Sequence, residues 1–213
     1  MAKLILVRHG ESTLNKENVY FGHLNPSLTS KGKEQLEILK NRLPTYDMIF
    51  SSPLERAISS AEIINHNKLI INTDDRLKEL NFGIFEGLNF NKISSLYPVE
   101  VEKWLVSNIS YKFINGESIY ELSERVKSFV EEIKYTEKTY LLVTHFGVIN
   151  AILSIYIAEN LNNFWKFKCD LSSITILEFN DGYPILKCFS LWYSKLKVML
   201  LTMFLFAIFS FWF

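Results

Sequence analysis

Short apolar segments alternate along this chain with longer segments whose apolar residues follow helical spacing, and this alternation constrains the fold more than any other feature. We expect strands over residues 3–7, 46–50, 69–71 and 140–143. We expect helices over residues 29–43, 53–64, 117–135 and 148–158. Strands separated by helices predict an α/β fold, a three-layer α/β/α sandwich with a mostly parallel central sheet. Residues 173–179 and 185–189, joined through 180–183, predict an antiparallel hairpin at its edge.

The chain length favours one domain with an appendage. At 213 residues the chain is longer than a typical domain of about 150 residues but short for two. We therefore expect a single domain over residues 1–195. Within it, Gly83, Gly87 and Pro98 break the pattern into short pieces, which predicts an excursion over about 74–116 that caps a site.

Residues 196–213 form a hydrophobic C-terminal tail, and three interpretations of it stay open. The run from Val198 to Phe213 carries no charge, and Lys195 and Lys197 precede it. It is a membrane segment with a positive cytoplasmic flank, a buried terminal helix or oligomer contact, or a sequence not selected as part of the domain, such as a shifted reading frame. The chemistry predicted below is independent of this choice.

The overall charge excludes one class of partner. Lys and Arg total 23, and so do Asp and Glu, giving a net charge of zero. A basic surface of the kind that binds nucleic acid is therefore not expected, and any phosphate recognition must be local. Cys169 and Cys188 lack the spacing of a zinc site or a disulfide framework, so a reducing, cytoplasmic location is expected, with membrane association only through the tail. The sequence does not determine the oligomeric state.

Two histidines follow directly after predicted strands. His9 comes after the strand over residues 3–7, and His145 after the strand over 140–143. Because ligands of open α/β sheets bind outside the carboxyl ends of the strands, both side chains can reach one crevice. Taken singly, each histidine also fits a hydrogen-bonded residue at the rim of the sheet.

Two arginines are expected beside these histidines. Arg8 precedes His9, and Arg56 lies in the first turn of the helix predicted from residue 53. Planar guanidinium groups bind phosphoryl oxygens in a bidentate manner and neutralise their charge. The pattern favours a phosphoryl dianion as ligand, although Arg56 alone could equally pair with Glu55 or Glu62 on a solvated face.

The residue types also indicate how phosphoryl transfer would proceed. There is no P-loop glycine pattern and no dense carboxylate cluster, so neither a nucleotide loop nor a metal centre is expected. Without a metal, a neutral imidazole can act as the nucleophile and form a phosphohistidine. Glu79 is the expected proton donor to the leaving alkoxide if apolar neighbours keep it protonated, although by itself it also fits a surface carboxylate.

Six ordered motifs resemble the histidine phosphatase superfamily, in its phosphoglycerate mutase-like branch. They lie between about residues 3 and 155, and together they are far more specific than an isolated Arg-His-Gly tripeptide. They are Leu6-Val7-Arg8-His9-Gly10-Glu11-Ser12-Thr13-Leu14-Asn15, Tyr20-Phe21-Gly22 with Leu28-Thr29-Ser30-Lys31-Gly32, Ser51-Ser52-Pro53-Leu54-Glu55-Arg56-Ala57, Glu79-Leu80-Asn81-Phe82-Gly83-Ile84-Phe85-Glu86-Gly87, Gly116-Glu117-Ser118, and Val143-Thr144-His145-Phe146-Gly147-Val148-Ile149.

The resemblance implies a role for each residue of the expected site. It implies that His9 is phosphorylated, that Arg8, Arg56 and His145 form the phosphate pocket with Asn15 assisting, and that Glu79 is the general acid and later the base. It also implies an enzyme that needs no cofactor and no metal. Ser12 and Thr13 either donate to phosphate oxygens or cap the following turn.

Two positions depart from the family pattern, and both bear on substrate size and affinity. Phe146 stands where relatives commonly have glycine, and Asn150 stands where many have arginine.

Within the superfamily, residues 79–87 are similar to the corresponding string of α-ribazole phosphatases. The resemblance therefore implies hydrolysis of a small phosphomonoester, with α-ribazole 5′-phosphate of cobalamin nucleotide-loop synthesis as the leading substrate. Alternatives are a cofactor-dependent phosphoglycerate mutase and a broad-specificity or sugar phosphatase of the same superfamily. A non-catalytic phosphate-binding protein would have lost at least one of these site residues, and none is missing.

Overall fold

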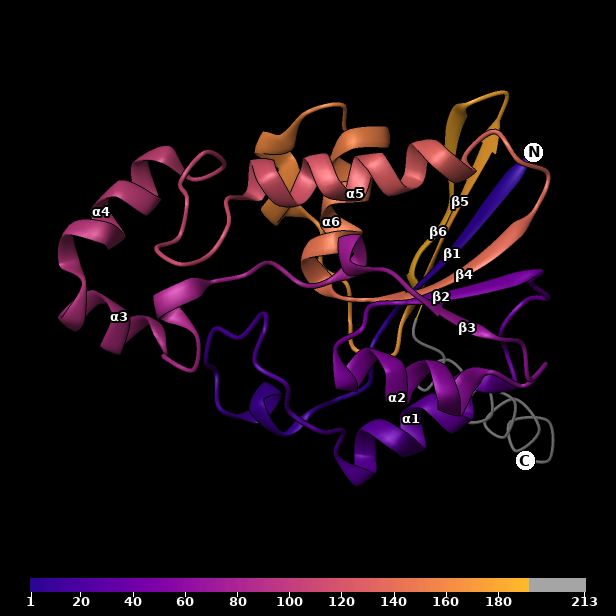
Figure 1. Ribbon diagram of the computed structural model, residues 1–213, viewed down its shortest axis with the longest axis horizontal. Coiled ribbons are helices and arrows are strands. Elements are labelled where there is room, and N and C mark those ends of the chain that lie inside the picture. Colours follow the sequence, from indigo (N-terminus) through magenta and orange to yellow (C-terminus); the bar gives the residue numbers. More distant parts are fainter. Residues whose placement is uncertain (192–213) are drawn as a thin grey trace, which may run out of the picture.

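A six-stranded sheet forms the centre of the protein in a computed structural model that describes residues 1–191 (Figure 1). The strand order is β3-β2-β4-β1-β5-β6. The first four of these pair in parallel, and β5 is antiparallel to both β1 and β6. The expected mostly parallel sheet with an antiparallel edge is confirmed. The strands are β1 (Ala2–Arg8), β2 (Met48–Ser51), β3 (Ile71–Thr73), β4 (Thr139–Thr144), β5 (Ile174–Asn180) and β6 (Tyr183–Leu191).

Helices cover both faces of the sheet, which gives the three layers expected from the sequence. In Figure 1, α1 (Ser30–Lys40) and α2 (Glu55–Ile64) lie below the sheet, whereas α5 (Ile119–Ile133) and α6 (Phe146–Tyr156) lie above it. A separate pair, α3 (Phe90–Leu96) and α4 (Pro98–Ser107), extends to the left of the sheet. Four short 3₁₀ segments complete the described chain: η1 (Thr13–Lys16), η2 (Asp75–Leu77), η3 (Gly83–Phe85) and η4 (Leu161–Lys166).

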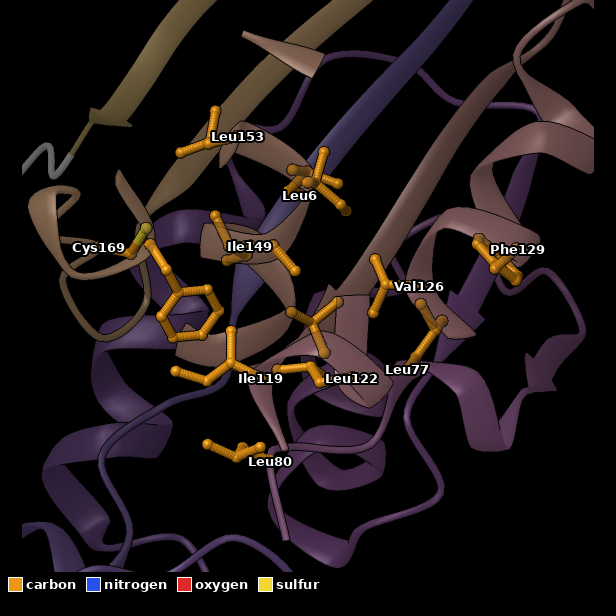
Figure 2. Close-up of a cluster of buried hydrophobic side chains, with 14 of the residues drawn as sticks. Leu6, Leu77, Leu80, Ile119, Leu122, Val126, Phe129, Ile149, Leu153 and Cys169 are labelled. Carbon is orange, nitrogen blue, oxygen red and sulfur yellow. The ribbon is translucent and has the colours of Figure 1, made fainter. Parts of the chain in front are cut away.

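Two apolar cores result from the alternation of side chains along the strands. Leu4 and Leu6 of β1 point into the core beneath α5 and α6, whereas Ile5 and Val7 point into the core with α1 and α2. Figure 2 shows part of the first core, in which Leu6 lies near side chains of α5 and α6. Because both faces of β1 are packed in these cores, the end of the strand has a fixed position. Arg8 is the last residue of β1 and His9 is the next residue, so both are fixed at the edge of the sheet.

Local signals in the sequence account for several element ends. Thr29 is the N-cap of α1 and accepts a hydrogen bond from the Gly32 N–H. Ser118 and Glu121 form a capping box at the start of α5. Asp181 and Gly182 both have positive φ, as a two-residue hairpin turn between β5 and β6 requires.

The expected elements are present, but most of their expected boundaries differ from the observed ones by up to three residues, and local contacts explain two of these differences. The third strand starts at Ile71, two residues later than the segment 69–71 predicts, because the side chain of Asn65 hydrogen bonds with both the N–H and the carbonyl of Leu69. Helix α2 starts at Glu55, because Leu54 has extended backbone and is the N-cap, so Pro53 precedes the helix instead of occupying its first turn.

The segment 74–116 contains η2, η3, α3 and α4, between β3 and α5. The interpretations of the tail over residues 196–213 lie outside the described residues. Within residues 1–191, no helix is long and apolar enough to span a membrane.

Candidate active site

The ends of two adjacent parallel strands bring the two histidines together. Arg8 of β1 pairs in register with Thr144 of β4, so His9 and His145 follow at neighbouring positions. Their ring centroids are 5.1 Å apart, and both side chains are buried. The sheet topology thus produces the juxtaposition expected from the sequence.

Hydrogen bonds orient the His9 ring. Its Nδ1 lies 2.8 Å from the Gly10 carbonyl oxygen, an acceptor only, so Nδ1 carries the proton. Arg56 Nε donates to His9 Nε2 at 3.3 Å, so Nε2 presents a lone pair. Burial and the positive charges of Arg56 and Arg8 hold the pKa of His9 well below its ordinary value. His9 is therefore a neutral imidazole at physiological pH.

Arg56 is the second residue of α2 and is completely buried. Its guanidinium donates to the carbonyl oxygens of Leu24 at 2.8 Å and Gly22 at 2.7 Å, and it lies over the Phe21 ring at 5.1 Å. Burial lowers its pKa to about 10, which leaves it positively charged at neutral pH. Arg56 thus brings a fixed cation to His9 instead of pairing with Glu55 or Glu62.

Glu86 fixes the loop over residues 22–24, to whose carbonyl oxygens Arg56 donates. Its carboxylate accepts hydrogen bonds from the backbone N–H groups of Gly22 at 2.9 Å, His23 at 2.8 Å and Leu24 at 2.9 Å. Glu86 was not among the site residues expected from the sequence. Its position in the motif over 79–87 was the one signal that could have indicated it.

Glu79 is buried and lines the same cavity as His9. Its Oε1 accepts hydrogen bonds from the N–H groups of Leu80 and Gly147, each at 2.9 Å, and its own carbonyl accepts one from Arg125 at 3.1 Å. Burial raises the pKa of this carboxyl group, and the nearby arginines and the backbone N–H groups oppose that effect only in part. A raised pKa is what a proton donor needs near neutral pH.

A cavity of about 190 Å³ joins these groups. Five of the expected residues line it: Arg8, His9, Asn15, Arg56 and Glu79. Arg8 is held on the wall by a hydrogen bond to the Cys169 carbonyl oxygen at 2.6 Å and lies 5.3 Å from the centre of the Phe146 ring. The cavity has the charge and size to bind a phosphoryl group.

Three expected residues do not line this cavity. His145 lies beside His9, and its Nε2 lies 2.8 Å from the hydroxyl of Ser52. Ser12 is the N-cap of η1, and both its N–H and its hydroxyl donate to Asn15 Oδ1 at 2.8 Å. Ser12 therefore follows the capping alternative and orients Asn15, and Thr13 is exposed.

Four aromatic residues that were not expected at the site complete the cavity wall. They are Tyr20, Phe21, Phe82 and Trp165. Phe146, noted as a departure from the family pattern, lines the wall and stacks on Trp165 with ring centroids 6.3 Å apart. Asn150, the other departure, is buried behind the site and donates to the carbonyl oxygens of Phe164 and Phe167, which fixes the segment carrying Trp165.

The comparison with protein families agrees with this geometry. The model of the histidine phosphatase superfamily (branch 1) matches residues 4–191. The chain belongs to the histidine phosphatase superfamily. It is a phosphatase, and its six-stranded α/β sandwich is the phosphoglycerate mutase-like fold. Within residues 1–191, no group of three or more His, Cys, Asp or Glu side chains is arranged to hold a metal ion.

Similar proteins include phosphatases with different named substrates. Phosphoserine phosphatase 1 of Hydrogenobacter thermophilus is 32% identical over 186 residues, covering 85% of this chain and 88% of the relative. Adenosylcobalamin/alpha-ribazole phosphatase of Escherichia coli is 26% identical over 190 residues, covering 87% and 94%. The crystal structure of the alpha-ribazole phosphatase from Shigella flexneri superposes with a TM-score of 0.83 at 26% identity, covering 89% of this chain and 96% of that one.

Proposed function

We propose that this phosphatase hydrolyses small phosphomonoesters through a phosphohistidine formed on His9. The observation that carries the proposal is the orientation of the His9 ring, because the Gly10 carbonyl oxygen engages Nδ1 and leaves Nε2 unprotonated. The Nε2 lone pair accepts a hydrogen bond from Arg56 Nε at 3.3 Å, which the ring gives up when Nε2 attacks phosphorus. A neutral imidazole with its lone pair at a phosphate-sized, cationic cavity is a competent nucleophile.

In the first step, His9 Nε2 attacks phosphorus, a new N–P bond forms, and the bond from phosphorus to the ester oxygen breaks. Arg8 and Arg56 neutralise the charge on the phosphoryl oxygens as the transition state forms, with Asn15 assisting. His145, whose pKa is held well below its ordinary value by burial and by the charge of Arg56, completes the phosphate pocket beside His9 as a neutral ring. Glu79, whose pKa is raised by burial, gives its proton to the departing alkoxide. The alcohol leaves neutral.

In the second step, water attacks the phosphohistidine. Glu79, now a carboxylate, takes a proton from this water as its oxygen bonds to phosphorus. The N–P bond breaks and returns its electron pair to His9 Nε2, which restores the free enzyme with Glu79 protonated. Neither step draws on a metal or a cofactor, as the resemblance implied.

The proposed substrate is α-ribazole 5′-phosphate, because residues 79–87 resemble α-ribazole phosphatases and two of the similar proteins carry that name. Phosphoserine is the second candidate, favoured by the 32% identity to phosphoserine phosphatase 1.

The choice of substrate is tested by measuring phosphate release from both compounds, from 3-phosphoglycerate and from fructose 2,6-bisphosphate. A kcat/KM for α-ribazole 5′-phosphate far above the others supports it, whereas a preference for phosphoserine overturns it. Isomerisation of 3-phosphoglycerate that depends on a bisphosphoglycerate primer would indicate the mutase.

The domain organisation and the location are part of the same proposal. Residues 1–195 act as one domain in which the excursion over 74–116 caps the site, since Glu79 and Phe82 from this excursion line the cavity. Cys169 and Cys188 are free thiols, which fits a reducing cytoplasm. Full activity of a variant truncated after Lys195 would support the domain boundary, and loss of folding would overturn it.

A further inference from the structure

A second cavity, of about 380 Å³, adjoins the phosphate cavity. We call it the aromatic cleft, and six residues line it: Tyr20, Phe90, Trp104, Leu105, Asn108 and Trp165. Tyr20 and Trp165 also line the phosphate cavity, so the two spaces share walls. The aromatic cleft is therefore a neighbouring space in which the alcohol part of a ligand bound at His9 could lie.

The walls of the aromatic cleft are held in place from two sides. Trp165 of η4 donates its indole N–H to Asn108 Oδ1 at 2.9 Å, which links η4 to the C-terminal end of α4. Trp104 of α4 packs edge-on against Tyr20 with ring centroids 5.5 Å apart. The cleft is thus preformed, and a ligand would not have to order it.

The chemistry of the cleft is apolar and neutral. None of its described lining residues carries a charge, and the Asn108 oxygen already accepts the Trp165 N–H. In the two cavities together, the cations among the described lining residues are Arg8 and Arg56, both at the phosphoryl end. A carboxylate on the alcohol part of a substrate would find no positive partner in the cleft, whereas a flat ring would find aromatic faces.

Large apolar side chains of the cleft are exposed to water. Leu105 is 67% exposed, Phe90 43% and Trp165 42%. Three such side chains around one concave surface provide apolar area that a bound ring would remove from water.

We propose that the aromatic cleft binds the alcohol part of the substrate and selects phosphomonoesters whose alcohol carries a planar aromatic group. The inference rests on the proposed function, since it places the phosphoryl group at His9. It assigns substrate selection to the cleft, with Leu105 and Trp165 as specificity-determining residues, and disfavours small substrates with a carboxylate.

The test compares 2-(2-naphthyl)ethyl phosphate, ethyl phosphate and O-phosphoserine as substrates of the full chain. The first two are esters of primary alcohols with similar leaving groups, so the ratio of their kcat/KM values reports binding of the ring. We expect this ratio to be about tenfold or more, because burying one aromatic ring contributes more free energy than a tenfold ratio requires. We expect kcat/KM for O-phosphoserine to be no higher than for ethyl phosphate. A smaller ratio, or a preference for O-phosphoserine, overturns the proposal.

Two neighbouring substitutions on α4 provide a matched comparison. Leu105→Asp places a charge in the aromatic cleft, whereas Val106→Asp places one at a site that is 82% exposed and outside the cleft lining. We expect Leu105→Asp to lower the naphthylethyl-to-ethyl ratio by about fivefold or more and Val106→Asp to change it by less than about twofold. A smaller fall with Leu105→Asp, or an equal fall with both, overturns the proposal.

Binding of the free alcohol separates this inference from the proposed function. Calorimetric titration with 2-naphthylethanol requires no catalysis, so it reports on the cleft even if none of the three esters is hydrolysed. We expect saturable binding that Leu105→Asp weakens and Val106→Asp does not. If 2-naphthylethanol does not bind, the proposed binding role of the aromatic cleft is wrong. If it binds but no phosphate is released from the esters, only the proposed hydrolytic function is wrong.

Discussion

Glu86 and Arg56 hold the same three-residue loop from opposite sides. The carboxylate of Glu86 accepts the N–H groups of residues 22–24, and the guanidinium of Arg56 donates to the carbonyl oxygens of Gly22 and Leu24. Arg56 also donates to His9 Nε2. The position of the proposed nucleophile therefore depends on a carboxylate that does not line the cavity.

Replacing Glu86 should slow the reaction more than it weakens substrate binding. In Glu86→Ala, four backbone N–H groups lose their acceptor, three of them in the loop over 22–24, so this loop shifts and Arg56 moves away from its place beside His9. We expect kcat to fall by about tenfold or more, with a smaller change in KM, and Glu86→Gln to recover part of the loss because its amide oxygen still accepts. Single-turnover formation of the phosphoenzyme, with thermal unfolding as control, measures this. A loss of stability with kcat unchanged would contradict the positioning role.

The pH dependence should follow from two shifted pKa values. His9, with its pKa lowered, stays neutral well into the acid range, and Glu79, with its pKa raised, stays protonated to higher pH than an ordinary carboxyl group. The first step needs both forms, so kcat/KM should be highest between these two pKa values and fall as pH rises through that of Glu79.

Glu79→Gln isolates the contribution of the proposed acid. We expect this variant to lose about 100-fold or more in kcat with alkyl phosphates and to lose the alkaline fall in kcat/KM that Glu79 causes. A pH–rate series on the wild-type enzyme and this variant measures both effects. A change confined to KM, or an alkaline fall that persists unaltered, would contradict the assignment.

The strand ends explain why much of the site could be predicted from the sequence. Arg8 ends a buried strand, and His9 and His145 each follow one directly. A parallel sheet brings such ends together without any information about side-chain packing. Arg56 could be placed because a helix start next to a strand end lies at the same edge.

Other parts of the site depend on tertiary contacts that no local pattern reveals. Trp165 reaches the cavity because Asn150 on α6 donates to the carbonyl oxygens of Phe164 and Phe167, which flank it. No sequence motif in either segment indicates this contact. Tyr20 and Phe82 lie on irregular chain: the backbone of Tyr20 is held by hydrogen bonds with Gly87 and Leu88, and that of Phe82 by one to Glu86. The start of β3 was misplaced for a similar reason, since one asparagine side chain captures the backbone of Leu69.

The stability of the link between the excursion and α5 should depend on pH through Asp74. Its hydrogen bond to Arg76, which also pairs with Glu132 on α5, lowers the pKa of Asp74. A carboxyl group whose pKa is lower in the folded state stabilises the fold above its unfolded pKa of about 3.9, and this contribution is lost as pH falls through the folded value.

Asp74→Asn should therefore lower the free energy of unfolding at pH 7 by about 1 kcal/mol, because the pair is partly exposed. The difference from the wild-type protein should shrink as pH falls below about 4. Urea unfolding over a pH series measures it, with Asp75→Asn, whose side chain is 79% exposed, as the control. Equal effects of the two substitutions would exclude a specific role for the Asp74 pair.

Removal of divalent metal should leave the activity unchanged. The proposed mechanism uses Arg8 and Arg56 to neutralise the phosphoryl charge, so no step depends on a metal ion. Dialysis against a chelator followed by an assay with and without added Mg²⁺ or Zn²⁺ tests this. Activity that is lost on dialysis and restored by one metal would contradict the mechanism.

The most direct test of the central claim is rapid acid- or base-quench labelling of the enzyme with a ³²P-phosphomonoester. We predict label that is stable in alkali and labile in acid, mapped to His9, and complete loss of both label and turnover in His9→Ala with an unchanged circular dichroism spectrum. His66→Ala, at an exposed histidine away from the cavity, should label like the wild-type protein. Turnover retained by His9→Ala, or label mapped to another residue, would contradict the account.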